Sequence, residues 1–217
     1  MDLVKVSISM LNGMVYTILL FLITIVVSLP LGLVAAFLSN SKNVLVHSFI
    51  RVYVFLMRGT PLMLQLFFVY FGLPFIPFIG SFLRMERFTA ACVAFVLNYA
   101  AYFCEIYRGG LFSIDKGQYE AAKVLGFSKW QMTSKIIIPQ MIKVVLPPVS
   151  NETITLVKDT ALVTSIGVAD MLHMAKAAVN SSSNVTPFII AGIFYLIITL
   201  GLTKLFQYLE KKYRKGI

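Results

Sequence analysis

Long apolar runs alternate with short polar and basic segments along this chain. A helix that crosses a bilayer needs about 20 mainly apolar residues. Five stretches meet this requirement and are predicted to be membrane-spanning helices: 14–38, 49–71, 88–107, 148–172 and 185–206. The fourth stretch is the weakest, since it carries four ionisable residues: Glu152, Lys158, Asp159 and Asp170. We expect it to begin near Pro147 or Pro148.

The composition turns this pattern of apolar stretches into a prediction of protein class. Of the 217 residues, 59% are hydrophobic and only 13% are charged, whereas an ordinary soluble domain carries roughly 25% charged residues. So little charge cannot cover a surface that faces water. The sequence therefore predicts a single all-α integral membrane domain over residues 1–217, with about five transmembrane helices.

The net charge of +10 would suit nucleic acid, but the positions of the basic residues argue against that class. They cluster around Lys42, in the segment 108–143, and in the tail Lys211, Lys212, Arg214 and Lys215. All three groups fall on one side of a five-span chain. Basic loops mark the cytoplasmic side of a membrane protein. We therefore expect an outside N-terminus, a cytoplasmic C-terminus and contact with a lipid bilayer rather than with nucleic acid.

No motif of a nucleotide-hydrolysing or metal-dependent enzyme occurs in the sequence. The phosphate-binding pattern G-x-x-x-x-G-K-[ST], the serine nucleophile elbow and the zinc-binding H-E-x-x-H helix are all absent. Cys92 and Cys104, if they share a helix, lie about 18 Å apart at ~1.5 Å per residue, which is too far for a disulfide. We expect a chain that is not an enzyme and that holds no cofactor or metal of its own.

Residues 113–139 are too polar to span a membrane, yet they are patterned like helices. Asp115 followed by Gln118, and Ser128 followed by Gln131, are typical of capping boxes that begin helices. Gly126 fits the left-handed position just past a helix end. Two short helices joined at Gly126 are therefore predicted. Their small alanine side chains would suit docking into another protein, and a linker lying on the membrane interface is the equal alternative.

This segment resembles the signature of bacterial ABC importer permeases, which is E-A-A, three residues, G, nine residues, I, one residue and L-P. The matching positions are Glu120, Ala121, Ala122, Gly126, Ile136, Ile138 and Pro139. Ile138 stands where leucine is usual, which is a conservative departure. In that family the segment forms coupling helices that fit a cleft on the ATPase subunit, so we call residues 113–139 the coupling segment. The resemblance implies ATPase coupling for six residues: Glu120, Ala121, Ala122, Gly126, Phe127 and Ser128.

Further matches are similar to the polar amino acid permeases of the histidine/glutamine/arginine/cystine type. They lie at residues 58–62, 65–66, 98–102, 105–110 and 158–162. The resemblance implies a type I ABC importer permease fold in a bacterial inner or plasma membrane, and import of polar amino acids by alternating access. The implied partners are two ABC ATPase subunits that bind ATP-Mg, an external amino acid binding protein, and a second permease chain. That second chain would be an identical copy or a sister permease.

Polar groups inside a span are expensive, so they are candidates for the substrate pathway. The candidates are Gln65, Asn98, Tyr102, Asp159 and Thr160. Three of them have a structural alternative. Asp159 could pair with Lys158 or with an arginine of the second span, and Asn98 could hydrogen-bond a neighbouring helix. Thr160 could bond back to its own helix.

A second group of charged residues is expected to act as a gate or a scaffold at the inner edge of the pathway. Its members are Arg58, Glu105, Arg108 and Lys158. Glu105 is expected to pair with Arg58 or Arg108 rather than to contact substrate.

Two other classes of membrane protein are alternatives. A secondary amino acid transporter not coupled to an ATPase predicts two related halves, and the sequence contains no such repeat. A secondary transporter would also leave the coupling segment without a purpose. A channel or a structural membrane protein is the second alternative, and it predicts no dependence on an ATPase partner.

Overall fold

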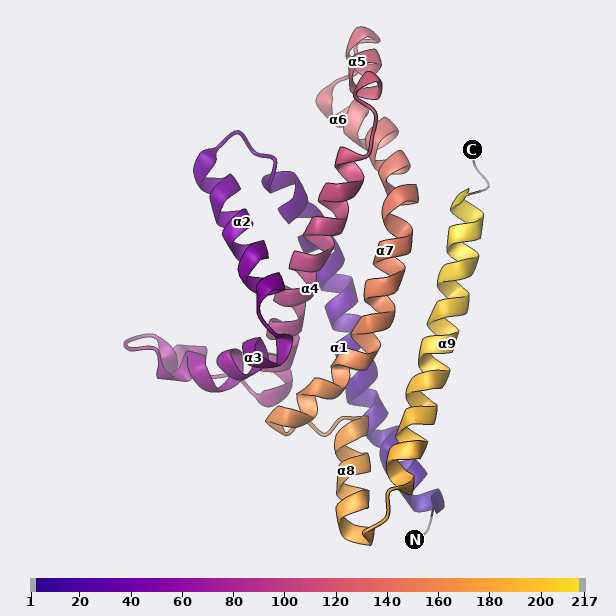
Figure 1. The fold of residues 1–217 in the computed structure, drawn as a ribbon. Coiled ribbons are helices and arrows are strands. Elements are labelled where there is room, and N and C mark those ends of the chain that lie inside the picture. The colour runs from indigo at the N-terminus through magenta and orange to yellow at the C-terminus, as the bar shows by residue number, and fades with distance from the viewer. Residues whose placement is uncertain (1–2, 215–217) are drawn as a thin grey trace.

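The computed structural model describes residues 3–214 of the chain, all of its regular elements in that range being helical. Five described helices of 16 or more residues form the bundle (Figure 1): α1 Leu3–Leu38, α2 Val44–Gly59, α4 Arg87–Phe112, α7 Ile138–Asp159 and α9 Thr186–Arg214. Shorter α-helices join them: α3 Leu62–Phe67, α5 Lys116–Val124, α6 Lys129–Met132 and α8 Met171–Ser182. Lys215 of the basic tail lies outside the described residues.

Short turns of other helix types continue or separate these elements. The π-helical turns are Phe68–Gly72 and Thr133–Ile137, and the 3-10 turns are Leu73–Phe75, Gly80–Leu83 and Thr160–Ile166. One π-helical turn connects α6 directly to α7. At the α7 end the coupling segment is therefore joined to the bundle by continuous helix.

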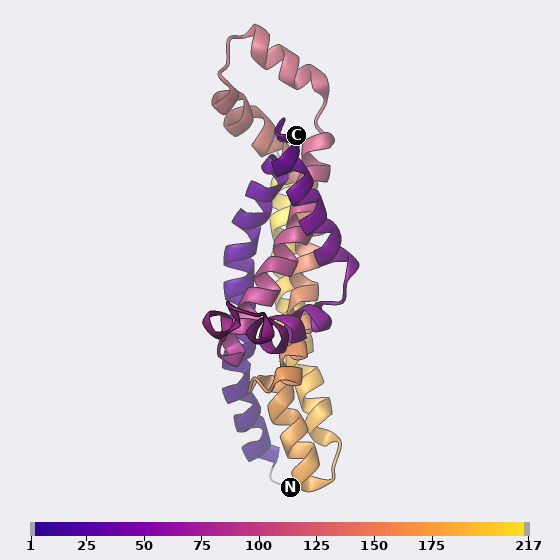
Figure 2. The same ribbon diagram turned by 90° about the vertical axis from the view of Figure 1, so that its left-hand side faces the viewer.

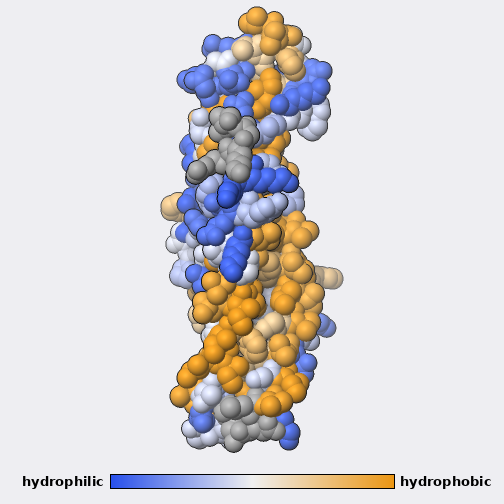
Figure 3. Space-filling view, turned by 90° about the vertical axis from the view of Figure 1, so that its right-hand side faces the viewer, coloured by the Kyte–Doolittle hydropathy of each residue, from blue (hydrophilic) through white to orange (hydrophobic). Residues whose placement is uncertain are grey.

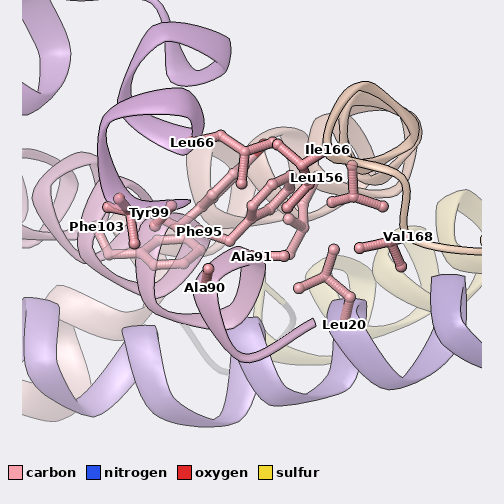
Figure 4. Packing of buried hydrophobic residues seen from close by; sticks show 13 residues of the cluster. Leu20, Leu66, Ala90, Ala91, Phe95, Tyr99, Phe103, Leu156, Ile166 and Val168 are labelled. Atoms are coloured by element: carbon pink, nitrogen blue, oxygen red, sulfur yellow. The ribbon is translucent and has the colours of Figure 1, made fainter. Parts of the chain in front are cut away.

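The core lies where α4 packs against α1, α3 and α7. Phe95 and Tyr99 of α4 are buried against Leu20 of α1, Leu66 of α3 and Leu156 of α7, and Figure 4 shows these side chains meeting. Buried alanines spread along α4 let neighbouring helices approach it closely: Ala90, Ala91, Ala94 and Ala101. Small residues at helix contacts are typical of membrane proteins, because lipid supplies no hydrophobic force that drives helices together.

The outer surface of the bundle is apolar. Helix α9 is hardly covered by the rest of the chain, with 6% of its most apolar window buried. Its exposed side chains include Ile189, Ile193, Leu196, Ile197 and Leu200. Figure 3 views the side of the molecule that carries α9. Apolar side chains cover most of the lower half of this side, and the upper half carries hydrophilic and apolar side chains together. Such a surface suits lipid contact rather than water.

Three described helices are long and apolar enough to cross a membrane, or up to five if each bent pair counts as one span. The single helices are Val4–Leu38, Arg87–Phe112 and Thr186–Tyr213, and the bent pairs are Val44–Gly59 with Leu62–Phe75 and Lys129–Ile166 with Met171–Ser182. The helices extend beyond the predicted stretches 14–38, 88–107 and 185–206 at their ends. Hydropathy alone does not register helical residues outside the most apolar window.

The predicted second span, 49–71, is not one straight helix. Helix α2 begins at Val44 and ends at Gly59, and the next segment bends away by 108°. The cause is Pro61, because the residue before a proline is driven out of the α region. Thr60 accordingly has φ −121° and ψ 148°. Figures 1 and 2 show α3 and the turns after it leaving the bundle sideways.

The predicted fourth span, 148–172, does not coincide with one helix. Helix α7 begins at Ile138 and runs through Pro147 and Pro148, which lie inside it rather than at its start. Proline is tolerated within membrane helices because neighbouring groups re-satisfy the backbone that it frees. At the far end the chain tightens into a 3-10 turn that ends at Gly167, whose φ is +77°. Helix α8 then leaves at 55° as a separate element.

The three basic segments that were expected on one side of the membrane lie at the same end of the bundle. The α1–α2 turn, the coupling segment and the end of α9 all lie at one end of the molecule (Figure 1). The start of α1 and the α8–α9 turn lie at the other end. We call the first the coupling end.

Candidate functional site

The break between α2 and α3 is stabilised by two amide side chains. In a continuous helix the Met57 carbonyl would accept a hydrogen bond from residue 61, but Pro61 has no N–H group. Gln65 Nε2 donates to that carbonyl at 2.9 Å and Asn98 Nδ2 at 3.0 Å. Asn98 Nδ2 also lies 2.9 Å from Gln65 Oε1. Both predicted pathway residues therefore have a structural function at the break.

A hollow of about 480 Å³ opens beside this break, lined from α4, α7 and the α2–α3 turn. Its charged lining consists of Glu152 and Asp159, with no lysine, arginine or histidine. We call it the acidic hollow. Tyr99, only 2% exposed, donates its hydroxyl proton to Asp159 Oδ2 at 2.7 Å. This bond fixes the Asp159 carboxylate through one oxygen, and the other oxygen, Oδ1, has no hydrogen bond within residues 3–214.

Three of the five predicted pathway residues line the acidic hollow, and two do not. Asn98, Tyr102 and Asp159 line the acidic hollow. Gln65 stands behind the lining and reaches it through its bond with Asn98. Thr160 is fully buried and donates to its own helix, at 2.6 Å from the Val157 carbonyl.

Sequence reasoning missed two residues of this hollow. Glu152 lies on the same face of α7 as Asp159, because seven residues make nearly two whole turns of helix. That spacing was visible in the sequence as a pair of carboxylates in one apolar stretch. Tyr99 follows Asn98 directly, and nothing in the sequence marks it as the donor to a carboxylate 60 positions away.

A second hollow of about 620 Å³ lies between α2 and α4, nearer the coupling end. Its charged residues are Arg51, Arg58, Glu105 and Arg108, so we call it the basic hollow. Arg108 Nε and Nη2 donate to the two oxygens of Glu105 at 2.8 and 2.7 Å, and Arg58 Nη1 lies 3.3 Å from Glu105 Oε2. Glu105 thus contacts both arginines that were expected as its partners. Lys158 is exposed and lines neither hollow.

The coupling segment forms the two predicted short helices, but only one of the two expected capping boxes. The Ser128 and Gln131 side chains form the reciprocal capping box that begins α6, and Gly126 adopts the left-handed conformation with φ +75°. Asp115 caps α5 differently, since its carboxylate accepts from the Gly117 backbone at 2.6 Å. Gln118 Oε1 instead accepts from a side chain of α7, Gln140 Nε2, at 3.3 Å.

The outer face of the coupling segment is apolar in part. Glu120 and Ala121 are exposed, whereas Ala122 is buried and holds α5 against the rest of the segment. The exposed apolar side chains are Val124, Leu125 and Trp130, which the E-A-A pattern does not mark. Partial burial raises the pKa of Tyr119, which faces inward on the same helix.

Comparison with known proteins gives this arrangement a family. Residues 28–215 match the family described as "Binding-protein-dependent transport system inner membrane component". The arginine transport system permease protein ArtQ of Bacillus subtilis (strain 168) is 40% identical over 95% of this chain and 93% of its own. The glutamine transport system permease protein GlnP of Escherichia coli (strain K12) is 36% identical over 85% of this chain and 83% of its own.

A solved structure described as an amino acid ABC transporter with histidines has the same fold. It superposes with a TM-score of 0.87 at 32% identity, covering 97% of each chain. The all-α architecture with a helical segment between its third and fourth long helices is thus the type I ABC importer permease fold. The chain belongs to the binding-protein-dependent transport system inner membrane component family, and it is an amino acid ABC transporter permease.

Proposed function

We propose that the chain moves a polar amino acid into a bacterial cytoplasm through the acidic hollow. The observation that carries the proposal is the pair of carboxylates, Glu152 and Asp159, lining an open hollow beside a break in a membrane helix. Charged groups at such a depth require water, a partner or a substrate. A substrate ammonium group can satisfy both carboxylates, and this is the chemistry common to all amino acids.

The other lining residues supply orientation in this proposal. Tyr99 holds Asp159 in place through its hydroxyl group. Asn98 and Gln65 keep the break open, and Tyr102 presents an aromatic face to both hollows. Glu105, Arg58 and Arg108 form the gate or scaffold next to them. Thr160 and Lys158 would enter the pathway or its gate only in other states of the alternating-access cycle.

A second permease chain completes the pathway in this proposal. Both hollows open on the surface of this single chain, and hydrocarbon cannot cover carboxylates and guanidinium groups at low cost. A partner permease, identical or a sister chain, would close them on that side. An external binding protein would deliver the amino acid at the end opposite the coupling segment, where the N-terminus would then lie.

Energy would come from ATPase subunits at the coupling end, which would be cytoplasmic. Glu120, Ala121, Gly126, Phe127 and Ser128 would contact a cleft on the ATPase, with Ala122 as their buried support. Two such subunits would bind ATP-Mg and hydrolyse it. This chain would do no covalent chemistry, and its two conformations would be populated according to which state the partners bind more tightly.

The test is reconstitution of the chain with its ATPase and binding protein, followed by a screen of amino acids for stimulation of ATP hydrolysis. Stimulation by one or a few polar amino acids is expected. No co-purifying ATPase and no response would refute the importer and favour a secondary transporter.

Two variants separate the assignments within the same assay. Glu120→Lys should leave membrane insertion intact and uncouple ATP hydrolysis from transport, and normal stimulation in this variant would remove the coupling assignment. Asp159→Asn should weaken amino acid stimulation while the complex still assembles. Failure to assemble would instead indicate that Asp159 serves structure alone.

A further inference from the structure

The basic hollow carries more positive charge than its own carboxylate neutralises. Arg51 and Arg58 lie seven residues apart on one face of α2, and Arg108 faces them from α4. Glu105 is the single carboxylate among the lining residues. Three guanidinium groups and one carboxylate leave a formal surplus of two positive charges.

Glu105 is already fully engaged by two of these arginines. Both of its oxygens accept from Arg108, and Arg58 lies 3.3 Å from one of them. Arg51, by contrast, forms no hydrogen bond or ion pair with any residue in the range 3–214. Its five N–H donors are therefore available to a ligand.

Aromatic rings hold the two paired arginines in position. The Arg58 guanidinium lies 5.5 Å from the centre of the Tyr102 ring, and the Arg108 guanidinium lies 5.6 Å from that of Phe112. Stacked guanidinium groups keep their edge N–H donors free and lose little side-chain freedom when an anion binds. The hollow is thus organised before any ligand arrives.

Tyr102 connects the basic hollow to the acidic one, because its side chain lines both. Two adjoining hollows of opposite charge match the two ends of an amino acid zwitterion. A ligand that moved from the acidic hollow into the basic one would pass Tyr102 and enter the hollow that Arg51 lines.

We infer that the basic hollow is a carboxylate-binding site, in which Arg51 binds the carboxylate group of the amino acid on its way to the coupling end. The inference rests on the proposed function and adds a second station to the pathway. An amino acid carboxylate fits better than a lipid phosphate for two reasons. The basic hollow adjoins the acidic one at Tyr102, and its volume of about 620 Å³ is typical of a site for a small molecule.

The experiment measures binding of two ligands to the permease–ATPase complex in nanodiscs, without binding protein or nucleotide. One ligand is the amino acid that best stimulates ATP hydrolysis, and the other is the same molecule with its α-carboxyl group converted to a carboxamide. Three proteins are compared: wild type, Arg51→Gln and Lys42→Gln. The last is a matched control, because Lys42 lies exposed in the α1–α2 turn and lines neither hollow.

The carboxamide should bind about tenfold more weakly than the amino acid to wild type and to Lys42→Gln, as expected for loss of a charge-assisted hydrogen bond. In Arg51→Gln that ratio should fall at least about threefold, because the carboxylate has lost its partner. An equal ratio in all three proteins would overturn the inference. Arg51-dependent retention of anionic lipid, with an unchanged ratio, would overturn it in favour of a headgroup site.

Failure of this inference is distinguishable from failure of the proposed function. If the chain is not an amino acid importer, wild type itself neither binds the amino acid nor responds in the ATPase screen. If only the carboxylate site is wrong, stimulation of ATP hydrolysis remains and the three ratios agree.

Discussion

The contact between α1 and α4 at Gly32 permits a sharp test of how this bundle is held together. A Cβ atom on Gly32 would lie 2.7 Å from Phe103 Cβ, 3.0 Å from the Ala100 carbonyl oxygen and 3.1 Å from the Cys104 nitrogen. Two of these atoms are backbone of α4, so they cannot rotate away. Gly32→Ala must therefore push the two helices apart.

The expected loss of stability follows from two opposing effects. Overpacking a close contact costs typically ~1–3 kcal/mol, whereas replacing glycine with alanine inside a helix contributes about 1 kcal/mol of helix propensity. The net destabilisation is then at most about 2 kcal/mol. Gly192→Ala is the matched control, because nothing lies within 4 Å of its added Cβ on α9. It should gain only the propensity and become as stable as wild type or more so.

Thermal unfolding of the purified chain in one detergent measures both variants against wild type. Gly32→Ala should unfold at a lower temperature and Gly192→Ala at an equal or higher one. The same change of residue should thus act in opposite directions at the two sites. If Gly32→Ala were as stable as Gly192→Ala, the close approach of α1 to α4 would be refuted.

Three other substitutions each remove a single hydroxyl group. Tyr99→Phe should destabilise the chain by about 1.5 kcal/mol, because the Asp159 carboxylate loses its hydrogen-bond donor. Tyr102→Phe is the control, since the Tyr102 hydroxyl has no hydrogen bond within the described residues. An equal loss of stability in both variants would contradict the prediction. Thr24→Val should stabilise by up to about 1 kcal/mol, since the buried Thr24 hydroxyl has no partner within the described residues. Thr17→Val, which removes the acceptor of a backbone N–H, should not stabilise in the same unfolding assay. Ser128→Ala should speed amide hydrogen exchange in the first turn of α6 and leave α4 unchanged.

The coupling segment could be predicted in detail because its structure depends on neighbours in sequence. A capping box needs only Ser128 and Gln131, three positions apart, and a left-handed turn needs only a glycine at the helix end. Both features are present where they were expected. The other expected capping box does not form, because Asp115 accepts from the Gly117 N–H and Gln118 bonds to Gln140 of α7.

The course of the second and fourth spans could not be predicted from apolar content alone. A window of hydropathy is blind to direction, so it reads the apolar residues on both sides of Pro61 as one span although the chain turns by 108° there. Conversely, Pro147 and Pro148 suggested a helix start and proved to lie within α7. The same residue type broke one helix and not the other, and local sequence did not distinguish the two cases.

The charged positions were the other limit of sequence reasoning. Glu152 and Asp159 counted against the fourth span because ionisable residues lower its hydropathy. In the fold they lie on one face of α7 and line the acidic hollow together. Their separation by two helical turns is a stronger signal than their effect on hydropathy, since lipid-facing positions would not tolerate such a pair.

The break at Pro61 gives Asn98 and Gln65 a structural function, and their place in the substrate pathway stays a prediction. Without Pro61 the Met57 carbonyl would bond within its own helix, and neither amide would be needed there. With it, both amides bond to that carbonyl, and Thr60, Pro61 and Leu62 turn aside to form one wall of the acidic hollow. The hollow exists because the helix breaks, and the break is stable because these amides satisfy it. A substitution at Asn98 should therefore impair folding and amino acid response together, so that transport assays at this position need a stability measurement beside them.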